Sequence, residues 1–154
     1  MSEKAEIITH ILELAESRGE DHGVPYAGIV TPHEAYKLHE ADPVHIKVID
    51  VRSRAEWELV GYIPNTIQVE WQTYPGWESN PQFLSQLEQQ VNADDVLLFI
   101  CRTGARSNNA ATFAAQAGFT RCYNIAEGFE GDKNEKNQRC SVNGWRASNL
   151  PWHN

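Results

Sequence analysis

Short apolar runs alternate along this chain with segments that carry helix signals, and this alternation limits the folds that it can adopt. The runs are rich in β-branched and aromatic side chains, as buried strands are. We expect strands at Ile46–Val51, Thr66–Val69, Asp95–Ile100 and Thr120–Ile125. With helices between them, these strands predict one α/β domain that has a largely parallel central β-sheet and helices on both faces.

Local sequence signals mark where the helices between the strands begin. Two starts are capping boxes, in which a hydroxyl side chain and a glutamate three residues later complete the first turn. These are Thr31–Glu34 and Ser53–Glu56. Asn80–Pro81 opens another helix. Ser107–Ala117 is rich in alanine and is followed by Gly118, a typical helix stop.

The two ends of the chain add further elements. Apolar side chains recur at helical spacing between Glu3 and Ser17, which predicts an extra N-terminal helix on the flank of the domain. A dimerising or partner-binding helix is the alternative. Gly19–Gly23 is expected to be a connector, so residues 1–22 form the helix and connector and residues 23–154 the main domain.

After Ile125 the sequence changes character. The stretch from Gly128 to Gly144 is polar and glycine-rich, which is typical of loops. Large apolar groups return at Trp145–Trp152, where we expect a short helix docked on the body of the domain.

Composition and charge narrow the function classes. Hydrophobic residues make up 41% of the 154 residues and charged residues 22%, as in ordinary soluble domains. The formal net charge of −8 argues against nucleic acid and anionic membranes as general partners. No secretory signal or run of membrane-spanning length is visible, so we expect a cytoplasmic protein.

The strongest candidate for chemistry is Cys101, in the loop from Cys101 to Arg106 between an expected strand and an expected helix. N–H groups at the start of a helix point back towards such a position, and the helix dipole favours negative charge there. Arg102 and Arg106 add positive charge. Together these effects favour a thiolate, the reactive form of cysteine. Asp50 also ends an expected strand, so it can face the same crevice as Cys101.

The other candidates for chemistry are weaker. Cys122 falls inside an expected strand and is most simply a core residue, whereas Cys140 in the polar loop is either inert or a resolving thiol. The three cysteines and six histidines show no disulfide framework or metal spacing, so we expect reduced thiols and no metal or organic cofactor. The tryptophans that either rim the pocket or fill the core are Trp71, Trp77 and Trp145.

Three blocks of sequence, in this order, resemble the rhodanese-like sulfurtransferase family from about Tyr26 to Trp152. The first is Asp50-Val51-Arg52, followed by Glu56 and Gly61-Tyr62-Ile63-Pro64. The second is the Cys101–Arg106 loop, similar to the family's C-R-x-G-x-R. The third is Gly144-Trp145-Arg146 with Leu150-Pro151. The resemblance implies a single rhodanese-like domain.

The resemblance also implies a sulfur-transfer reaction. Cys101 would take a sulfane sulfur from thiosulfate or a similar small anion as a persulfide, and a thiol or a protein acceptor would then receive it. Arg102 is the first choice for binding the anion and Arg106 the second, because guanidinium groups neutralise an approaching anion. The N–H groups expected to cradle the sulfur belong to Arg102, Thr103, Gly104, Ala105 and Arg106. Asp50 and Arg52 are expected to brace the loop.

Two other functions remain open. A phosphatase or arsenate reductase on the same scaffold needs a C-x5-R loop, whereas Arg106 gives C-x4-R, which forms a tighter cradle. The second alternative is a carrier that holds a persulfide for a protein partner and turns over small molecules poorly. A carrier and an enzyme need the same loop, so the sequence leaves the choice between them open.

Overall fold

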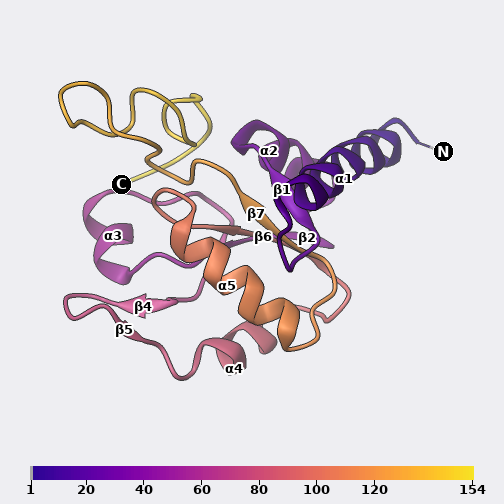
Figure 1. Cartoon of the computed structure of the whole chain (residues 1–154), viewed down its shortest axis with the longest axis horizontal. Coiled ribbons are helices and arrows are strands. Elements are labelled where there is room, and N and C mark those ends of the chain that lie inside the picture. The colour runs from indigo at the N-terminus through magenta and orange to yellow at the C-terminus, as the bar shows by residue number, and fades with distance from the viewer. Residues whose placement is uncertain (1) are drawn as a thin grey trace.

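The computed structural model describes residues 2–154, which form one parallel β-sheet with helices on both faces (Figure 1). The sheet has the order β1-β7-β6-β2-β3, and each neighbouring pair is parallel. Its strands are β1 (Gly28–Val30), β2 (Ile46–Asp50), β3 (Ile67–Gln68), β6 (Val96–Ile100) and β7 (Cys122–Ile125). The predicted α/β fold with a mostly parallel central sheet is therefore confirmed.

The helices divide between the two faces of the sheet because their apolar side chains enter two separate core clusters. Helices α1 (Glu3–His22) and α2 (Pro32–Ala41) pack on one face, and α4 (Phe83–Glu88) and α5 (Ala105–Gln116) pack on the other. The short α3 (Arg54–Leu59) follows β2. Both predicted capping boxes form, at Thr31–Glu34 and at Ser53–Glu56.

The N-terminal helix is longer and more central than a flanking helix. The expected connector at Gly19–Gly23 is wrong: α1 continues to His22 and ends at Gly23, whose φ of 66° gives a left-handed C-cap. Gly19 lies inside this helix, where the lack of a side chain permits a close approach to β1: a Cβ there would lie 2.9 Å from the Cα of Gly28. Side chains of α1 are buried in the core with those of the sheet, namely Ile11, Leu12 and Ala15.

Several elements differ from the sequence-based expectation. Strand β1 and the antiparallel hairpin of β4 (Gln72–Thr73) and β5 (Glu78–Ser79) are not predicted by any apolar run. The expected helix at Trp145–Trp152 is wrong, because this segment forms turns with Asn149 at a φ of 60°. The tail does dock as expected: Trp145 is buried, and its Nε1 donates to the carbonyl of Pro151 at 2.8 Å.

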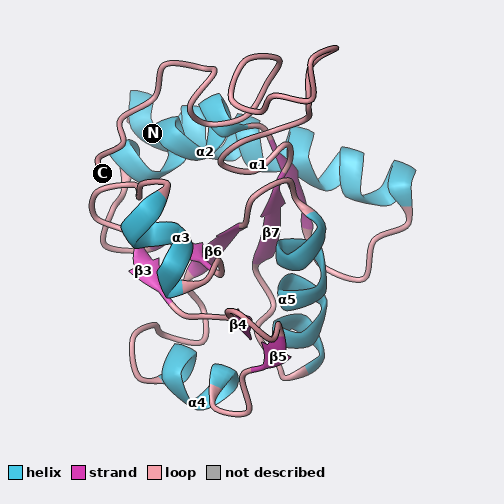
Figure 2. Ribbon diagram, turned by 90° about the vertical axis from the view of Figure 1, so that its left-hand side faces the viewer, coloured by secondary structure: helices cyan, strands magenta, loops and turns pink. Residues whose placement is uncertain are grey.

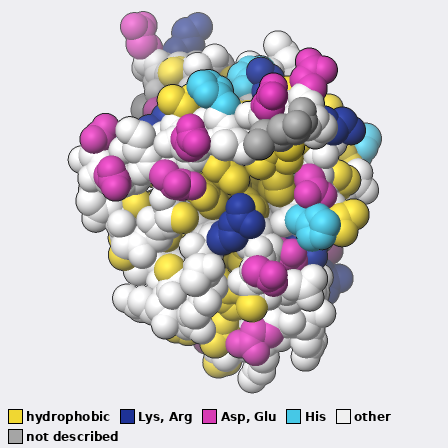
Figure 3. All heavy atoms as spheres, turned by 90° about the vertical axis from the view of Figure 1, so that its right-hand side faces the viewer, with side chains coloured by type: hydrophobic (Ala, Val, Ile, Leu, Met, Phe, Trp, Pro, Cys, Tyr) yellow, Lys and Arg dark blue, Asp and Glu magenta, His cyan; other side chains and the backbone are white. Residues whose placement is uncertain are grey.

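The surface opposite the carboxyl ends of the strands mixes acidic side chains with hydrophobic ones (Figure 3). A groove between α1 and α2 opens there, lined by side chains that include Ile7, His10, Tyr36 and Lys37. Within residues 2–154, no helix is long and apolar enough to cross a membrane.

Candidate active site

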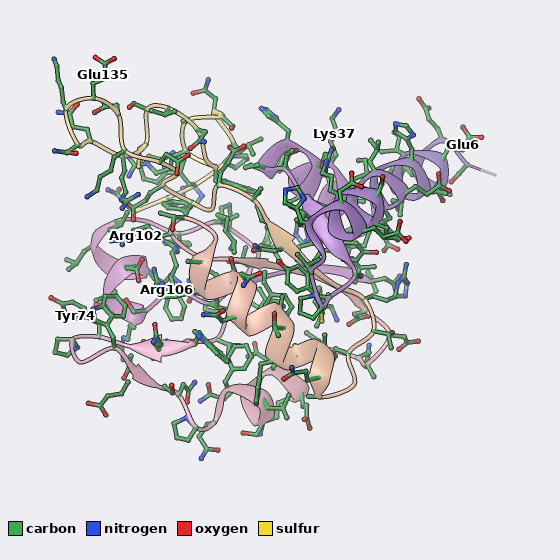
Figure 4. The ribbon with its side chains drawn as sticks, viewed as in Figure 1. Glu6, Lys37, Tyr74, Arg102, Arg106 and Glu135 are labelled. Carbon is green, nitrogen blue, oxygen red and sulfur yellow. The ribbon has the colours of Figure 1, made fainter. Side chains whose placement is uncertain are left out.

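The carboxyl ends of β2 and β6 bring two predicted site residues to the same edge of the sheet. Asp50 is paired with Ile100 in the parallel register, so Cys101 follows directly beside it. Figure 2 looks onto this end, where β6 and β7 end between α3 and α5, with the β4–β5 hairpin below. Arg102 and Arg106 lie at the same end, above Tyr74 of the hairpin (Figure 4). Asp50 and the Cys101 loop thus lie at the same carboxyl edge of the sheet, where the sequence analysis expected them to meet.

The Cys101 sulfur lies at the floor of the loop that precedes α5. Cys101 is 1% exposed, and the backbone N–H of Gly104 donates to its Sγ at 3.1 Å. Gly104 has a φ of 107° and is the N-cap of α5, so the helix begins at Ala105, two residues earlier than the sequence indicates. The first-turn N–H groups of a helix have no acceptor within it. The first-turn N–H groups of α5 come directly after the Cys101 loop in the chain, so they favour an anion at the sulfur.

A glycine behind the loop fixes its carbonyl groups. The N–H of Phe129 donates to the carbonyl of Cys101 at 2.8 Å, and the N–H of Glu130 donates to that of Arg102 at 3.0 Å. This contact needs Gly128, which has a φ of 71° and whose Cβ would lie 2.6 Å from the Cys101 carbonyl oxygen. Because these carbonyls are held on the side of residues 128–130, the N–H groups of the loop are free to face the sulfur.

Two polar side chains that the sequence analysis did not select also meet at the loop. The Oγ of Ser107 lies 3.3 Å from the Sγ of Cys101 and donates to the Oδ1 of Asn124 at 2.6 Å. The Nδ2 of Asn124 donates to the carbonyl of Gly104 at 3.2 Å. Both residues are buried. A visible signal for Asn124 was its polar side chain within the apolar run of β7, where a buried amide needs partners.

Asp50 and Arg52, which the sequence analysis expects to brace the loop, form a buried pair next to it. Both are fully buried, and the Nη2 of Arg52 donates to the Oδ2 of Asp50 at 2.8 Å and to the carbonyl of Gly61 at 2.8 Å. The Arg52 guanidinium also lies 4.1 Å from the centre of the Phe129 ring. The pair therefore ties the end of β2 to the segment behind Cys101.

The two arginines of the loop have different surroundings. Arg102 is exposed, whereas Arg106 is mostly buried and donates to both carboxylate oxygens of Glu56, at 2.7 and 2.9 Å. Burial lowers the pKa of Arg106, but the bonds and charge of Glu56 raise it by more, with smaller contributions from Cys101 and Asp50. Glu56 also closes the capping box of α3, so one carboxylate joins α3 to the first turn of α5.

Of the tryptophans named as rim candidates, Trp77 alone lies beside the loop. Its ring is 5.1 Å from the Arg106 guanidinium and it is 42% exposed. Trp71 packs against Phe83, and Trp145 is in the core.

The other two cysteines are not activated by their surroundings. Burial raises the pKa of Cys122 to about 12, and the residue lies in the core as the sequence indicated. Burial also raises the pKa of Cys140. No group of three or more His, Cys, Asp or Glu side chains that could hold a metal occurs within residues 2–154. Cys101 therefore remains the thiol with the strongest hydrogen-bonding support.

Fold and site together define a parallel α/β domain with a cysteine loop at the carboxyl edge of its sheet. The family model of the rhodanese-like domain matches residues 31–135. This match covers more than half of the chain, so the protein belongs to the rhodanese-like domain family. The resemblance seen in the sequence motifs is confirmed at the level of the family.

Individual proteins and one solved structure are also similar to this chain. An uncharacterised protein of Rickettsia conorii is 40% identical over 111 residues, which cover 68% of this chain and 80% of that protein. The crystal structure of Rv0390 from M. tuberculosis has 36% sequence identity and a TM-score of 0.76, covering 83% of this chain and 98% of that one. The chloroplastic thiosulfate sulfurtransferase 16 of Arabidopsis thaliana is 31% identical over 85 residues, covering 54% of this chain and 70% of that protein.

Proposed function

We propose that this protein is a sulfurtransferase that carries a sulfane sulfur on Cys101. The observation that carries the proposal is the loop geometry, in which the Gly104 N–H donates to Sγ at 3.1 Å and the free first-turn N–H groups of α5 follow. Such a set of donors stabilises negative charge on sulfur before and after transfer. The name of the Arabidopsis relative supports the same reaction class.

The proposed reaction has two balanced steps. The Cys101 thiolate attacks the outer sulfur of thiosulfate, a sulfur–sulfur bond to Cys101 forms, and the bond to the sulfonate sulfur breaks with its electron pair leaving on sulfite. A thiophilic acceptor such as cyanide or a thiolate then attacks the outer sulfur of the persulfide. The electron pair of the broken bond returns to Cys101 as thiolate, so no external oxidant or cofactor is needed.

The two loop arginines have different proposed roles in this reaction. Arg102, which is exposed, is proposed to attract the anionic donor. Arg106 keeps positive charge near the sulfur, but its guanidinium is held by Glu56, so we assign it mainly to fixing the loop. The net charge of −8 makes this local positive charge important for any anionic donor. A reducing compartment such as the cytoplasm fits the need for a free Cys101.

A carrier function is the second candidate, favoured by the near-complete burial of Cys101. A persulfide on such a sulfur would be shielded from small acceptors until a protein partner engages the loop. The chemistry on Cys101 is the same, and the two functions differ in which acceptor removes the sulfur.

Intact-mass measurement after incubation with thiosulfate tests the proposal. The reduced protein should gain one sulfur, cyanide should remove it with release of thiocyanate, and Cys101→Ser should gain none. Cys140→Ser is the matched control and should behave like the native chain. A persulfide that forms but resists cyanide would favour the carrier. Sulfur uptake that survives in Cys101→Ser would rule out Cys101 as the acceptor atom.

A further inference from the structure

Asn124 lies where an apolar residue would be expected, in the middle of the buried strand β7. It is 8% exposed, and its neighbours in the strand are buried. Its amide joins the loop carbonyl of Gly104 to the hydroxyl of Ser107, and both of those residues lie against the Cys101 sulfur. A buried amide that bonds on both sides holds its partners in one arrangement.

The direction of these bonds follows from the chemistry of their partners. A backbone carbonyl only accepts, so the NH2 group of Asn124 must face Gly104. The amide oxygen then faces Ser107 at 2.6 Å, and the hydroxyl must donate to it. Ser107 has one proton but two acceptors within reach, because the Cys101 sulfur lies 3.3 Å away on the other side. With a neutral thiol, the S–H of Cys101 can donate to the free lone pair of that hydroxyl.

We infer that Asn124 is a positioning residue for Cys101: it holds the Ser107 proton while the sulfur is a thiol and yields it to the sulfur when the thiol ionises. A small rotation of the hydroxyl changes the acceptor, since Ser107 lies in reach of both. A bond to a charged acceptor is stronger than one to a neutral amide, which favours the rotated form once the sulfur is anionic. Meanwhile the Asn124 NH2 group keeps Gly104 in place, so its N–H stays directed at the sulfur.

This inference deepens the proposed function, because a thiolate and a persulfide would use the same hydroxyl. It does not require that thiosulfate be the donor. Its test is therefore the reactivity of the Cys101 thiol itself, measured by alkylation.

The pH dependence of alkylation by iodoacetamide, followed at Cys101 by peptide mass spectrometry, gives the midpoint of thiolate formation. Ser107→Ala removes the donor, and Asn124→Asp offers the hydroxyl a charged competitor and removes the bond to Gly104. Each variant should move the midpoint up by about one pH unit, which slows alkylation about tenfold below the midpoint. In the Ser107→Ala background, Asn124→Asp should shift the midpoint by less than it does alone.

Apart from the carboxylate that Asn124→Asp introduces, the native charges around Cys101 are the same in all variants. They are Asp50 and Arg52 after β2, Glu56 on α3, and Arg102 and Arg106 of the loop and α5. Tyr26 donates to Asn108 at 2.6 Å and also interacts with Asn124. Burial raises the pKa of Tyr26 by more than the interaction with Asn124 lowers it, so this phenol stays neutral. Circular dichroism and thermal melting establish that each variant is folded.

Two results would overturn the inference. One is an unchanged midpoint in Ser107→Ala, which removes a hydroxyl without adding charge or volume. The other is full additivity of the two substitutions, which would mean that the effect of Asn124→Asp comes only through Gly104 or the new charge, and that Asn124 does not act through the Ser107 proton. Both outcomes can be read even if thiosulfate transfers no sulfur, so a failure of the proposed function is distinguishable from a failure of this inference.

Discussion

At the scale of the residue, the two loop arginines differ in whether their charge is already paired with a carboxylate. Arg106 is held by two hydrogen bonds to Glu56 and by the ring of Trp77, so its charge is already engaged. Arg102 is exposed at the entrance to the same loop. An incoming anion would therefore meet Arg102 first.

Arg102→Ala should raise the KM for thiosulfate about threefold to tenfold, because it removes a charge-assisted contact worth about 1 kcal/mol at an exposed site. The kcat should change little, since the sulfur keeps its N–H donors. Steady-state kinetics at low and high salt measure both effects, and the difference should shrink as salt rises. Arg121→Ala, with the same change of net charge at the opposite end of β7, is the control. An equal KM in both variants would contradict an anion-binding role for Arg102.

The sequence could predict Cys101 and the loop around it because a strand, a glycine turn and a helix lie next to one another in the chain. Asn124 was missed because its bonds to Ser107 and Gly104 span 17 and 20 positions, which no local spacing encodes. Ser107 lies only six positions from Cys101, but its bond to Asn124 also depends on the tertiary fold. Glu56 was found as a capping residue, but its bond to Arg106 spans 50 positions. The position of the cysteine loop was therefore predictable, whereas its buried polar partners required the tertiary fold.

At the scale of the element, α1 and β1 pack closely against each other at two glycines, Gly19 and Gly28. Gly28 lies so close to α1 that a Cβ there would collide with the backbone of Ala15 and lie 2.9 Å from the N of Glu16. Gly19 makes the reciprocal approach from the helix. The contact explains why a three-residue strand with a glycine, which no apolar run announces, still forms the edge of the sheet.

Gly28→Ala should destabilise the fold by about 1–3 kcal/mol, because a methyl group must push the backbones of α1 and β1 apart. Thermal unfolding should show a Tm lower by several degrees. In Gly76→Ala, the matched control, a Cβ meets the flexible end of the Glu78 side chain, so the Tm should stay nearly unchanged. Equal melting temperatures for Gly28→Ala and the native chain would show that α1 can move away without cost.

The tail shows the opposite error, in which an apolar pattern suggested a helix that does not form. Trp145 and Leu150 are buried, so the pattern correctly marked a docked segment. However, Asn149 has a φ of 60°, which is outside the helical region. The indole N–H of Trp145 donates to the carbonyl of Pro151, so a side chain rather than a helical turn holds this end of the segment. Burial was readable from the apolar residues, whereas the backbone path depended on contacts with the rest of the domain.

At the scale of the whole molecule, stability depends on carboxylates paired with basic side chains. Glu34, Glu56 and Asp95 bond to Arg18, Arg106 and Lys47, respectively. For each carboxyl, burial raises the pKa, but the bonds and charge of its basic partner contribute to lowering it below the ordinary 4.5 or 3.8. Groups with a lowered pKa contribute stability above their unfolded values and lose it as the pH falls.

The free energy of unfolding should therefore fall as the pH drops below about 4.5, and Glu56→Gln should reduce this fall. At pH 7 we expect this variant to be less stable by about 1–3 kcal/mol, because Arg106 loses a charged partner, and its curve should approach the native one near pH 3. Urea titrations at several pH values measure this. Glu58→Gln, an exposed carboxylate in the same helix, is the control, and parallel native and Glu56→Gln curves would contradict the expectation.

The backbone support behind Cys101 comes from a segment that is synthesised after Cys101 itself. A nascent chain that ends at Ile125 already contains the thiol, the glycine turn and α5. It still lacks the Gly128–Glu130 backbone that fixes the loop carbonyls. Because domains fold as their chains are completed, the cysteine acquires its full set of aligned donors late in synthesis. The order of synthesis thus places the completion of the Cys101 loop after the completion of the segment that supports it.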